Sequence, residues 1–142
     1  MGSTVIEEAR AYWERIRGAR SMPARADIDP AEIKRLLPHI LLLDVAREPL
    51  DFRYRLIGTE IDRHSAETHT GKWISEIPDR APPSTVWDNL RQVVETRLPS
   101  ERTVPYVGPL KDFVATRQIV LPLGNDDREV NMLMVVIDYV RG

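Results

Sequence analysis

The chain has 142 residues and a formal net charge of −2, from 20 Lys and Arg against 22 Asp and Glu. The arginines are scattered through every segment, which argues against a nucleic-acid partner because phosphate binding needs clustered positive charge. The absence of cysteine excludes disulfides, thiolate nucleophiles, Cys-ligated metals and cysteinyl–flavin adducts. No apolar run reaches the ~18 residues of a transmembrane helix, and the N-terminus lacks a secretory signal. We therefore expect a single cytoplasmic domain that does not contact a membrane.

The first predicted element is an amphipathic helix over residues 5–17, ended by Gly18. Its apolar side chains recur with the helical period and so share one stripe. We expect this stripe to dock on the sheet of its own chain or on a second subunit, because it would otherwise form a sticky patch. We treat residues 1–18 as an added N-terminal helix and residues 19–142 as the domain proper. The stripe consists of Val5, Ile6, Ala9, Tyr12, Trp13 and Ile16.

A second, short helix is predicted to begin at Asp29, with Pro30 in its first turn, and to end near Leu37 before Pro38. The apolar run over residues 40–45 predicts a buried strand. Residues 51–57 alternate apolar and charged side chains, which predicts a half-buried strand. The residues between these two strands are typical of a hairpin.

Short helical turns are predicted over residues 58–83, the first of them capped by Thr59 and running to about Ala66. A longer helix is predicted after Ser84, which caps it, and before Pro99. Arg97 falls within the apolar stripe of this helix, so we expect its stem to be buried and its guanidinium group to reach solvent.

From residue 101 the hydrophobic period changes to two, which predicts strands over residues 102–107, 113–123 and 130–140. The last two are long and are expected in the middle of a twisted antiparallel sheet. Residues 130–139 are apolar on both faces except at Asn131 and Asp138, so we expect both faces of this strand to be covered.

This order of elements resembles that of PAS domains, in which a five-stranded antiparallel sheet, split two strands then three, carries helices on one face. Several blocks are similar to those of a family of small bacterial, largely alphaproteobacterial, PAS-type proteins long catalogued as a domain of unknown function. The resemblance covers roughly residues 12 to 140. It implies an α+β, PAS-like fold with an extra N-terminal helix and a sensory or signalling role, but no agreed ligand. The blocks are Met22-Pro23-Ala24-Arg25, Asp27-Ile28-Asp29-Pro30, Leu36-Leu37-Pro38-His39, Phe52-Arg53-Tyr54-Arg55-Leu56-Ile57-Gly58-Thr59, Thr70-Gly71-Lys72 and Val120-Leu121-Pro122-Leu123.

The resemblance also implies a pocket between the sheet and the long helix. Aromatic walls with one or two polar groups suit a small organic ligand, although the same residue types also fill ordinary cores. Arg117, in the middle of a strand, needs a ligand carboxylate, an internal partner or solvent. His69 stands where the family often has an apolar residue, which makes it a pocket candidate. The candidate ligand-binding residues are Tyr54, His69, Trp73, Trp87, Arg117, Met132 and Met134.

The histidines do not predict a metal site. His64 and His69 are five residues apart and do not share a helix face as i, i+4 ligands would, so His39, His64 and His69 are interpreted as surface or loop residues. Haem-binding PAS domains take an axial histidine from the long helix, and residues 80–98 contain none. Non-covalent flavin stays open, without a glycine-rich phosphate loop to support it. The identity of any cofactor is therefore left unknown.

The leading hypothesis is a stand-alone sensory domain that binds a small organic ligand non-covalently. Because these elements occupy the whole chain, we expect the signal of ligand binding to pass to a signalling protein partner or to change the oligomeric state of a homodimer. The alternative is a ligandless docking or dimerisation module whose pocket is filled by the tryptophans and methionines. The least favoured reading is a small isomerase- or hydrolase-like enzyme using Asp62, His64 and Glu67 as acid and base. No nucleophile or recognised motif accompanies these residues, so we expect no enzymatic activity.

Overall fold

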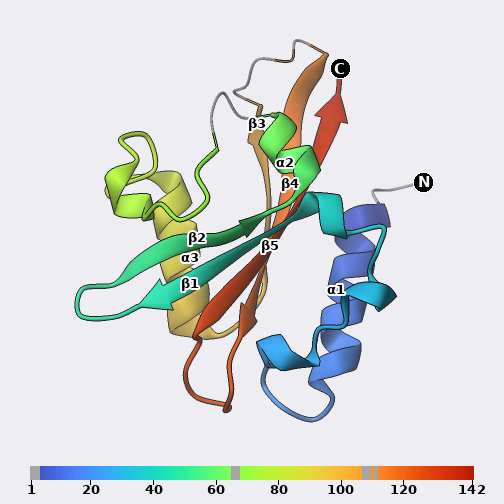
Figure 1. Ribbon diagram of the computed structural model, residues 1–142, viewed down its shortest axis with the longest axis vertical. Coiled ribbons are helices and arrows are strands. Elements are labelled where there is room, and N and C mark those ends of the chain that lie inside the picture. The colour runs from blue at the N-terminus through green and yellow to red at the C-terminus, as the bar shows by residue number, and fades with distance from the viewer. Residues whose placement is uncertain (1–3, 65–67, 107–109, 111) are drawn as a thin grey trace.

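The structure is a computed structural model that describes residues 4–64, 68–106, 110 and 112–142. In this part of the chain, five strands form one antiparallel sheet in the order β2-β1-β5-β4-β3 (Figure 1). This confirms the predicted α+β class and the split of two strands followed by three. The strands are β1 (Ile40–Ala46), β2 (Asp51–Ile57), β3 (Ser100–Pro105), β4 (Phe113–Leu123) and β5 (Met132–Arg141).

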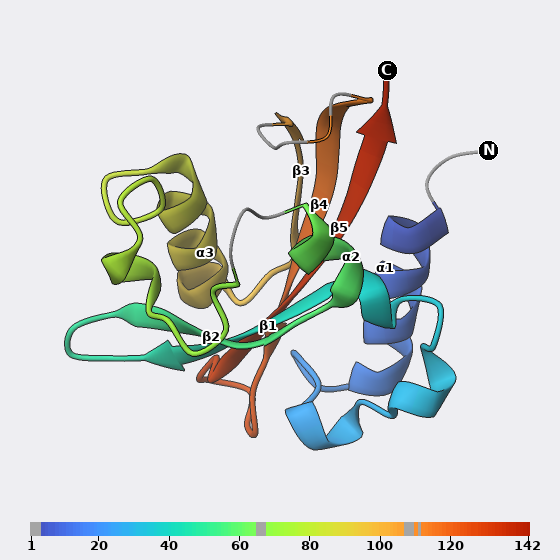
Figure 2. The same cartoon turned by 45° about the horizontal axis from the view of Figure 1, so that its top comes forward.

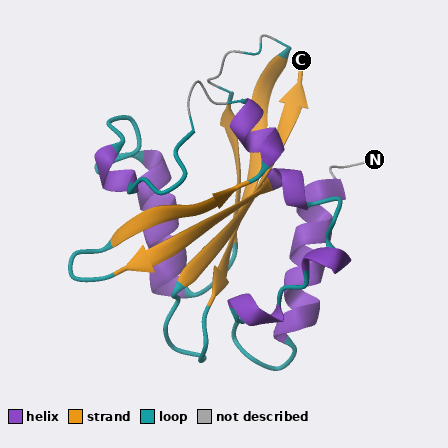
Figure 3. Ribbon diagram, in the orientation of Figure 1, coloured by secondary structure: helices purple, strands orange, loops and turns teal. Residues whose placement is uncertain are grey.

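Strand β5 occupies the centre of the sheet, paired with β1 on one side and β4 on the other. Leu133 to Val136 are all buried, so both faces of this strand are covered, as its sequence predicts. The cover comes from α1 (Thr4–Arg17) on one face and α3 (Thr85–Thr96) on the other, a layering visible in Figures 2 and 3. The cavity described below lies on the α3 side.

Helix α1 docks on the sheet of its own chain, which decides between the two predicted locations. Its stripe residues Ile6, Ala9 and Trp13 are buried against β4 and β5. The indole Nε1 of Trp13 donates a hydrogen bond of 2.9 Å to the carbonyl of Pro122. Strand β3 pairs with β4 only as far as Val120, so the indole bonds a β4 carbonyl that lies beyond the β3 ladder.

The segment between α1 and β1 is less helical than predicted. Asp29 is a cap, since its Oδ1 accepts from the N–H of Ala31 at 3.0 Å, but only one 3-10 turn (Pro30–Glu32) follows. Ile33 leaves helical geometry, with φ −130° and ψ 34°, and its side chain is buried. Core burial therefore overrides the local helix signal. A further 3-10 turn, Leu37–His39, leads into β1.

Helix α2 (Thr59–Arg63) begins one residue earlier than predicted and is shorter, because Gly58 is its N-cap. A Cβ atom at Gly58 would lie 2.4 Å from the carbonyl oxygen of Pro38. Glycine is therefore required here by the close approach of α2 to the 3-10 turn before β1.

Helix α3 begins as predicted, since Ser84 Oγ accepts from the N–H of Trp87 at 3.0 Å. Its end differs from the prediction, because Arg97 is the C-cap, in the left-handed conformation with φ 60°. Arg97 is exposed rather than stem-buried, and its guanidinium donates to the carbonyl of Arg128 at 3.0 Å. Among the described residues, no helix is long and apolar enough to span a membrane.

Candidate functional site

A cavity of about 300 Å³ lies between the α3 side of the sheet and the helical layer formed by α2, residues 68–81 and α3. The sheet supplies most of its apolar wall, and the helical layer supplies much of its polar lining. The residues used in the argument below are Leu43, Tyr54, His64, His69, Asp79, Arg80, Asn89, Leu90, Tyr106, Thr116, Gln118, Val135, Ile137 and Tyr139.

Strand alternation decides which side chains of β4 face the cavity. Thr116, Gln118 and Val120 line it, which places Arg117 on the opposite face. There Arg117 Nη2 pairs with Glu101 Oε2 at 3.0 Å, and this guanidinium lowers the pKa of the Glu101 carboxylate. The prediction of Arg117 as a ligand contact is therefore not supported, because an internal carboxylate satisfies it.

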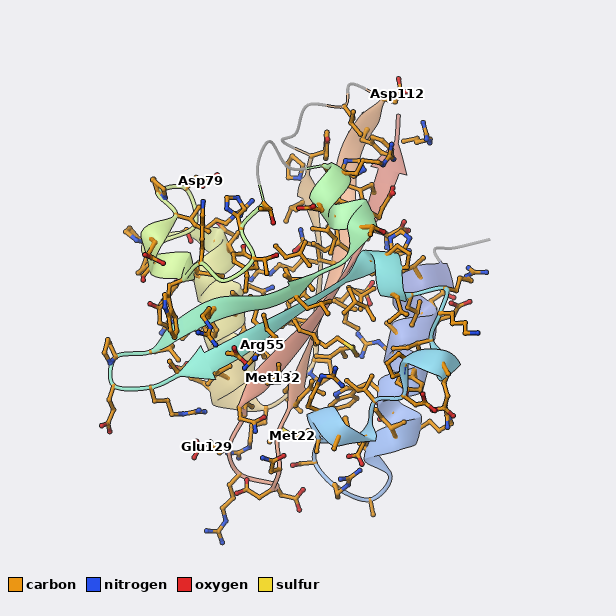
Figure 4. All side chains as sticks on the ribbon, in the orientation of Figure 1. Met22, Arg55, Asp79, Asp112, Glu129 and Met132 are labelled. Atoms are coloured by element: carbon orange, nitrogen blue, oxygen red, sulfur yellow. The ribbon has the colours of Figure 1, made fainter. Side chains whose placement is uncertain are left out.

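The two candidate methionines of β5 also lie on the α1 side. Val135, Ile137 and Tyr139 line the cavity, and side chains alternate along a strand, so Met132 and Met134 point away from it. Figure 4 shows Met132 near the lower end of the sheet, far from Asp79 in the loop above the cavity.

The two candidate tryptophans pack outside the cavity as well. Trp87 lies on α3, and its buried ring meets that of Phe52 on β2 edge-on, with centroids 5.2 Å apart. Trp73 lies under the guanidinium of Arg53, 5.5 Å from its centroid, and its backbone bridges to β2. Both residues belong to the packing of the helical layer and do not line the cavity wall.

Tyr54 and His69 do line the cavity, together with an arginine that sequence reasoning missed. The ring of His69 stacks on Tyr54 with centroids 5.9 Å apart, and Arg80 Nη1 donates to the Tyr54 hydroxyl oxygen at 3.2 Å. The backbone N–H of Tyr54 donates to the carbonyl of Lys72, which fixes the loop against β2. Burial raises the pKa of Tyr54, while the charge of Arg80 acts in the opposite direction. Tyr54 is therefore a neutral phenol at pH 7.

A second polar group centres on His64, which caps the C-terminal end of α2. The prediction of a surface or loop histidine is wrong for His64, because its side chain is only 2% exposed. Its ring stacks on Tyr139 at 3.6 Å between centroids, and the edge of Phe113 meets it at 4.7 Å. Strands distant in sequence thus bury this histidine.

One hydrogen bond and one nearby carboxylate bear on the protonation of the His64 ring. Its Nδ1 is 3.0 Å from the hydroxyl oxygen of Tyr106, which also accepts from the N–H of Leu110. Tyr106 can therefore donate its own proton to Nδ1, leaving Nε2–H directed at Glu60 Oε2, 3.6 Å away. Burial lowers the pKa of His64, and the carboxylate of Glu60 acts against that shift. His64 is thus a neutral imidazole at pH 7. Burial also raises the pKa of Tyr139, the ring stacked on it.

The structure describes two of the three residues of the hypothetical acid–base group, Asp62 and His64. Asp62 is exposed, and Glu67 lies outside the described residues. The carboxylate beside His64 is Glu60, which sequence reasoning did not single out. Across residues 4–64, 68–106, 110 and 112–142, no three His, Asp or Glu side chains are grouped so that they could hold a metal ion.

The remaining polar groups of the cavity come from α3 and β4. Asn89 is buried, and its Oδ1 accepts from Ser100 Oγ at 2.8 Å. Gln118 Nε2 donates to Thr116 Oγ1 at 3.0 Å. The sequence did carry a signal for Asn89. It lies three positions after Val86 and four before Val93, which puts a polar side chain inside an apolar stripe. Apolar walls with a few polar groups suit the binding of a small molecule.

A family model described as PAS domain matches residues 1–137. The match includes α1 as well as most of the sheet. No curated protein matches the chain.

Proposed function

The chain belongs to the PAS domain family, and from that premise we propose that it is a sensory domain that binds a small organic ligand non-covalently in the cavity. PAS domains generally act as sensory or interaction modules. In this proposal, occupancy is passed to a signalling protein or to a second copy of the chain. No covalent step is needed, because the ligand acts through its contacts alone.

The observation that carries the proposal is the cavity itself. Its volume of about 300 Å³ is at the lower end of the ~300–1,000 Å³ typical of small-molecule sites. A ligandless module would be expected to fill this space with its large side chains. Here Trp73, Trp87 and Met134 pack elsewhere, which favours ligand binding over the ligandless alternative.

The cavity is placed where occupancy can alter the fold. Its walls come from both the sheet and the helical layer, so a ligand that contacts both favours one packing of the two layers over another. Strand β5 contributes Val135 and Ile137 to the cavity, while its other face supports α1. We propose that the response to the ligand reaches the surface through this shared strand.

Native mass spectrometry of the purified protein tests the proposal. We expect a small molecule bound in a 1:1 ratio, or a rise in melting temperature with at least one member of a metabolite panel. The Leu90→Trp variant adds bulk at the cavity wall and is expected to abolish both signals. Leu98→Trp is the matched control, because Leu98 is 63% exposed and lies just beyond the end of α3.

Far-UV circular dichroism establishes that both variants are folded. An empty wild-type protein that shows no thermal response to the panel would contradict the proposal in favour of a docking or dimerisation module. Binding that survives in a folded Leu90→Trp variant would contradict the location of the site.

A further inference from the structure

We propose that the ligand of this cavity is a small organic acid whose carboxylate is bound by Arg80 and Tyr54. This inference rests on the proposed function and adds the chemical class of the ligand. It is carried by the charge of Arg80, by the place of Arg80 and Tyr54 in the cavity lining and by the donors that the two side chains present together.

Arg80 is half-buried at the cavity and has no acidic partner within the described part of the chain. Its guanidinium bonds the neutral hydroxyl of Tyr54. Two arginines of the sheet, by contrast, are paired with carboxylates: Arg53 with Asp44 and Arg117 with Glu101. Within the described part of the chain this half-buried guanidinium bonds a neutral phenol and no carboxylate, so an anionic ligand group would add a charge-assisted hydrogen bond.

The charge of Arg80 acts on two tyrosines of the sheet wall of the cavity. It lowers the pKa of Tyr54 on β2 and also that of Tyr139 on β5, opposing the larger effect of burial on each. Strand β1 lies between these two strands in the sheet. The guanidinium is therefore close enough to the interior of the cavity for a bound anion to feel its charge.

Arg80 and Tyr54 together present donors suited to the two oxygens of a carboxylate. The Tyr54 oxygen accepts from Arg80, so its own O–H stays available, and no acceptor for it occurs among the described residues. The guanidinium has further N–H groups besides the one it gives to Tyr54. One carboxylate oxygen can therefore accept from Arg80 and the other from Tyr54, whereas a neutral carbonyl offers a single, uncharged oxygen.

The carboxylate of Asp79 also lines the cavity, and its negative charge acts against anion binding. Asp79 is exposed, and Figure 4 shows it at the outer edge of its loop. Solvent and salt screen an exposed carboxylate more strongly than a half-buried guanidinium. The apolar residues Leu90, Val135 and Ile137 line the rest of the space, so the body of the acid is expected to be hydrocarbon or aromatic.

Isothermal titration calorimetry on the full chain tests the inference with two acids and their neutral amides. The probes are hexanoate against hexanamide and phenylacetate against phenylacetamide. We expect each acid to bind about tenfold or more tightly than its amide, as charge-assisted hydrogen bonds predict. Arg80→Gln is expected to remove this preference, and Tyr54→Phe to weaken the acids several-fold. Arg25→Gln is the matched control, because Arg25 is exposed and outside the cavity.

The comparison of acid with amide is made on the wild-type protein, so it does not depend on whether a variant folds. Arg80→Lys, which keeps the charge but loses the planar fork, is expected to retain part of the preference. Amides that bind as tightly as the acids, or a preference that survives in folded Arg80→Gln, would overturn the inference while leaving the proposed function intact. Binding of neither class would overturn the inference, and the proposed function falls with it only if the protein is also purified empty and shows no thermal response to the metabolite panel.

Discussion

Replacing Trp13 by Phe tests how the N-terminal helix is attached. Trp13 is 3% exposed, and its indole N–H donates to the Pro122 carbonyl at 2.9 Å. Phenylalanine keeps most of the apolar contact but has no donor, so the carbonyl is left buried without this partner. An unsatisfied buried group costs about 1–3 kcal/mol, and the smaller ring loses about another 1 kcal/mol of packing. We expect the free energy of unfolding to fall by about 2–4 kcal/mol.

Urea denaturation followed by far-UV circular dichroism measures this change without relying on tryptophan fluorescence. With a slope of about 2 kcal/mol per molar urea, the midpoint should move down by about 1–2 M while the slope stays constant. Glu7→Gln is the control on the same helix, because Glu7 is exposed. Its effect should stay within about 0.5 kcal/mol.

The concentration dependence of the same experiment distinguishes packing within one chain from packing across a dimer. Donor and acceptor belong to one chain, so the loss on Trp13→Phe should be independent of protein concentration. A loss that changes with concentration, or a variant as stable as the wild type, would refute the docking of α1 described here.

Three further changes have defined outcomes. Gly58→Ala places a Cβ atom 2.4 Å from the Pro38 carbonyl oxygen and should lower stability by about 1–3 kcal/mol; an unchanged thermal melt would contradict this close approach. Burial holds the pKa of His64 below its usual value of about 6.5, so the unfolded chain binds the proton more readily and stability should fall as the pH drops below about 6.5. His64→Phe should remove that part of the pH dependence in chemical denaturation, and an identical pH profile in the variant would count against it. Arg117→Gln breaks a partly exposed ion pair with Glu101, so stability should change by no more than about 1 kcal/mol and calorimetric affinity for any ligand of the cavity should not change.

The accuracy of the predicted site follows from how each strand is covered. Strand β2 alternates half-buried and buried side chains over residues 51–54, in step with the charged and apolar residues of its sequence, and Tyr54 does point inward and line the cavity. Strands β4 and β5 carry buried side chains on both faces, and an alternation of period two then cannot show which face holds a cavity. Arg117 and Met134 were assigned to the wrong face for this reason.

The burial of His64 was beyond the reach of local sequence reasoning. It caps a five-residue helix, too short for a spacing argument, and the rings around it come from residues 106, 113 and 139. Long-range contacts of this kind are set by the pairing of the strands and not by residues near position 64. The split of the sheet into two strands and then three was predictable from the resemblance to PAS domains, since the pairing of β1 with β5 joins residues far apart in the sequence.

Strand β5 lies between the cavity and the N-terminal helix. Val135 and Ile137 face the cavity, while Val136 between them is fully buried on the other face, the side that α1 covers. Close packing on both faces means that a displacement of this strand toward a ligand leaves a gap on the α1 side unless α1 moves with it. On the proposed function, a ligand in the cavity would act on the packing of the N-terminal helix through one strand. We propose this as the role of α1 beyond covering apolar surface.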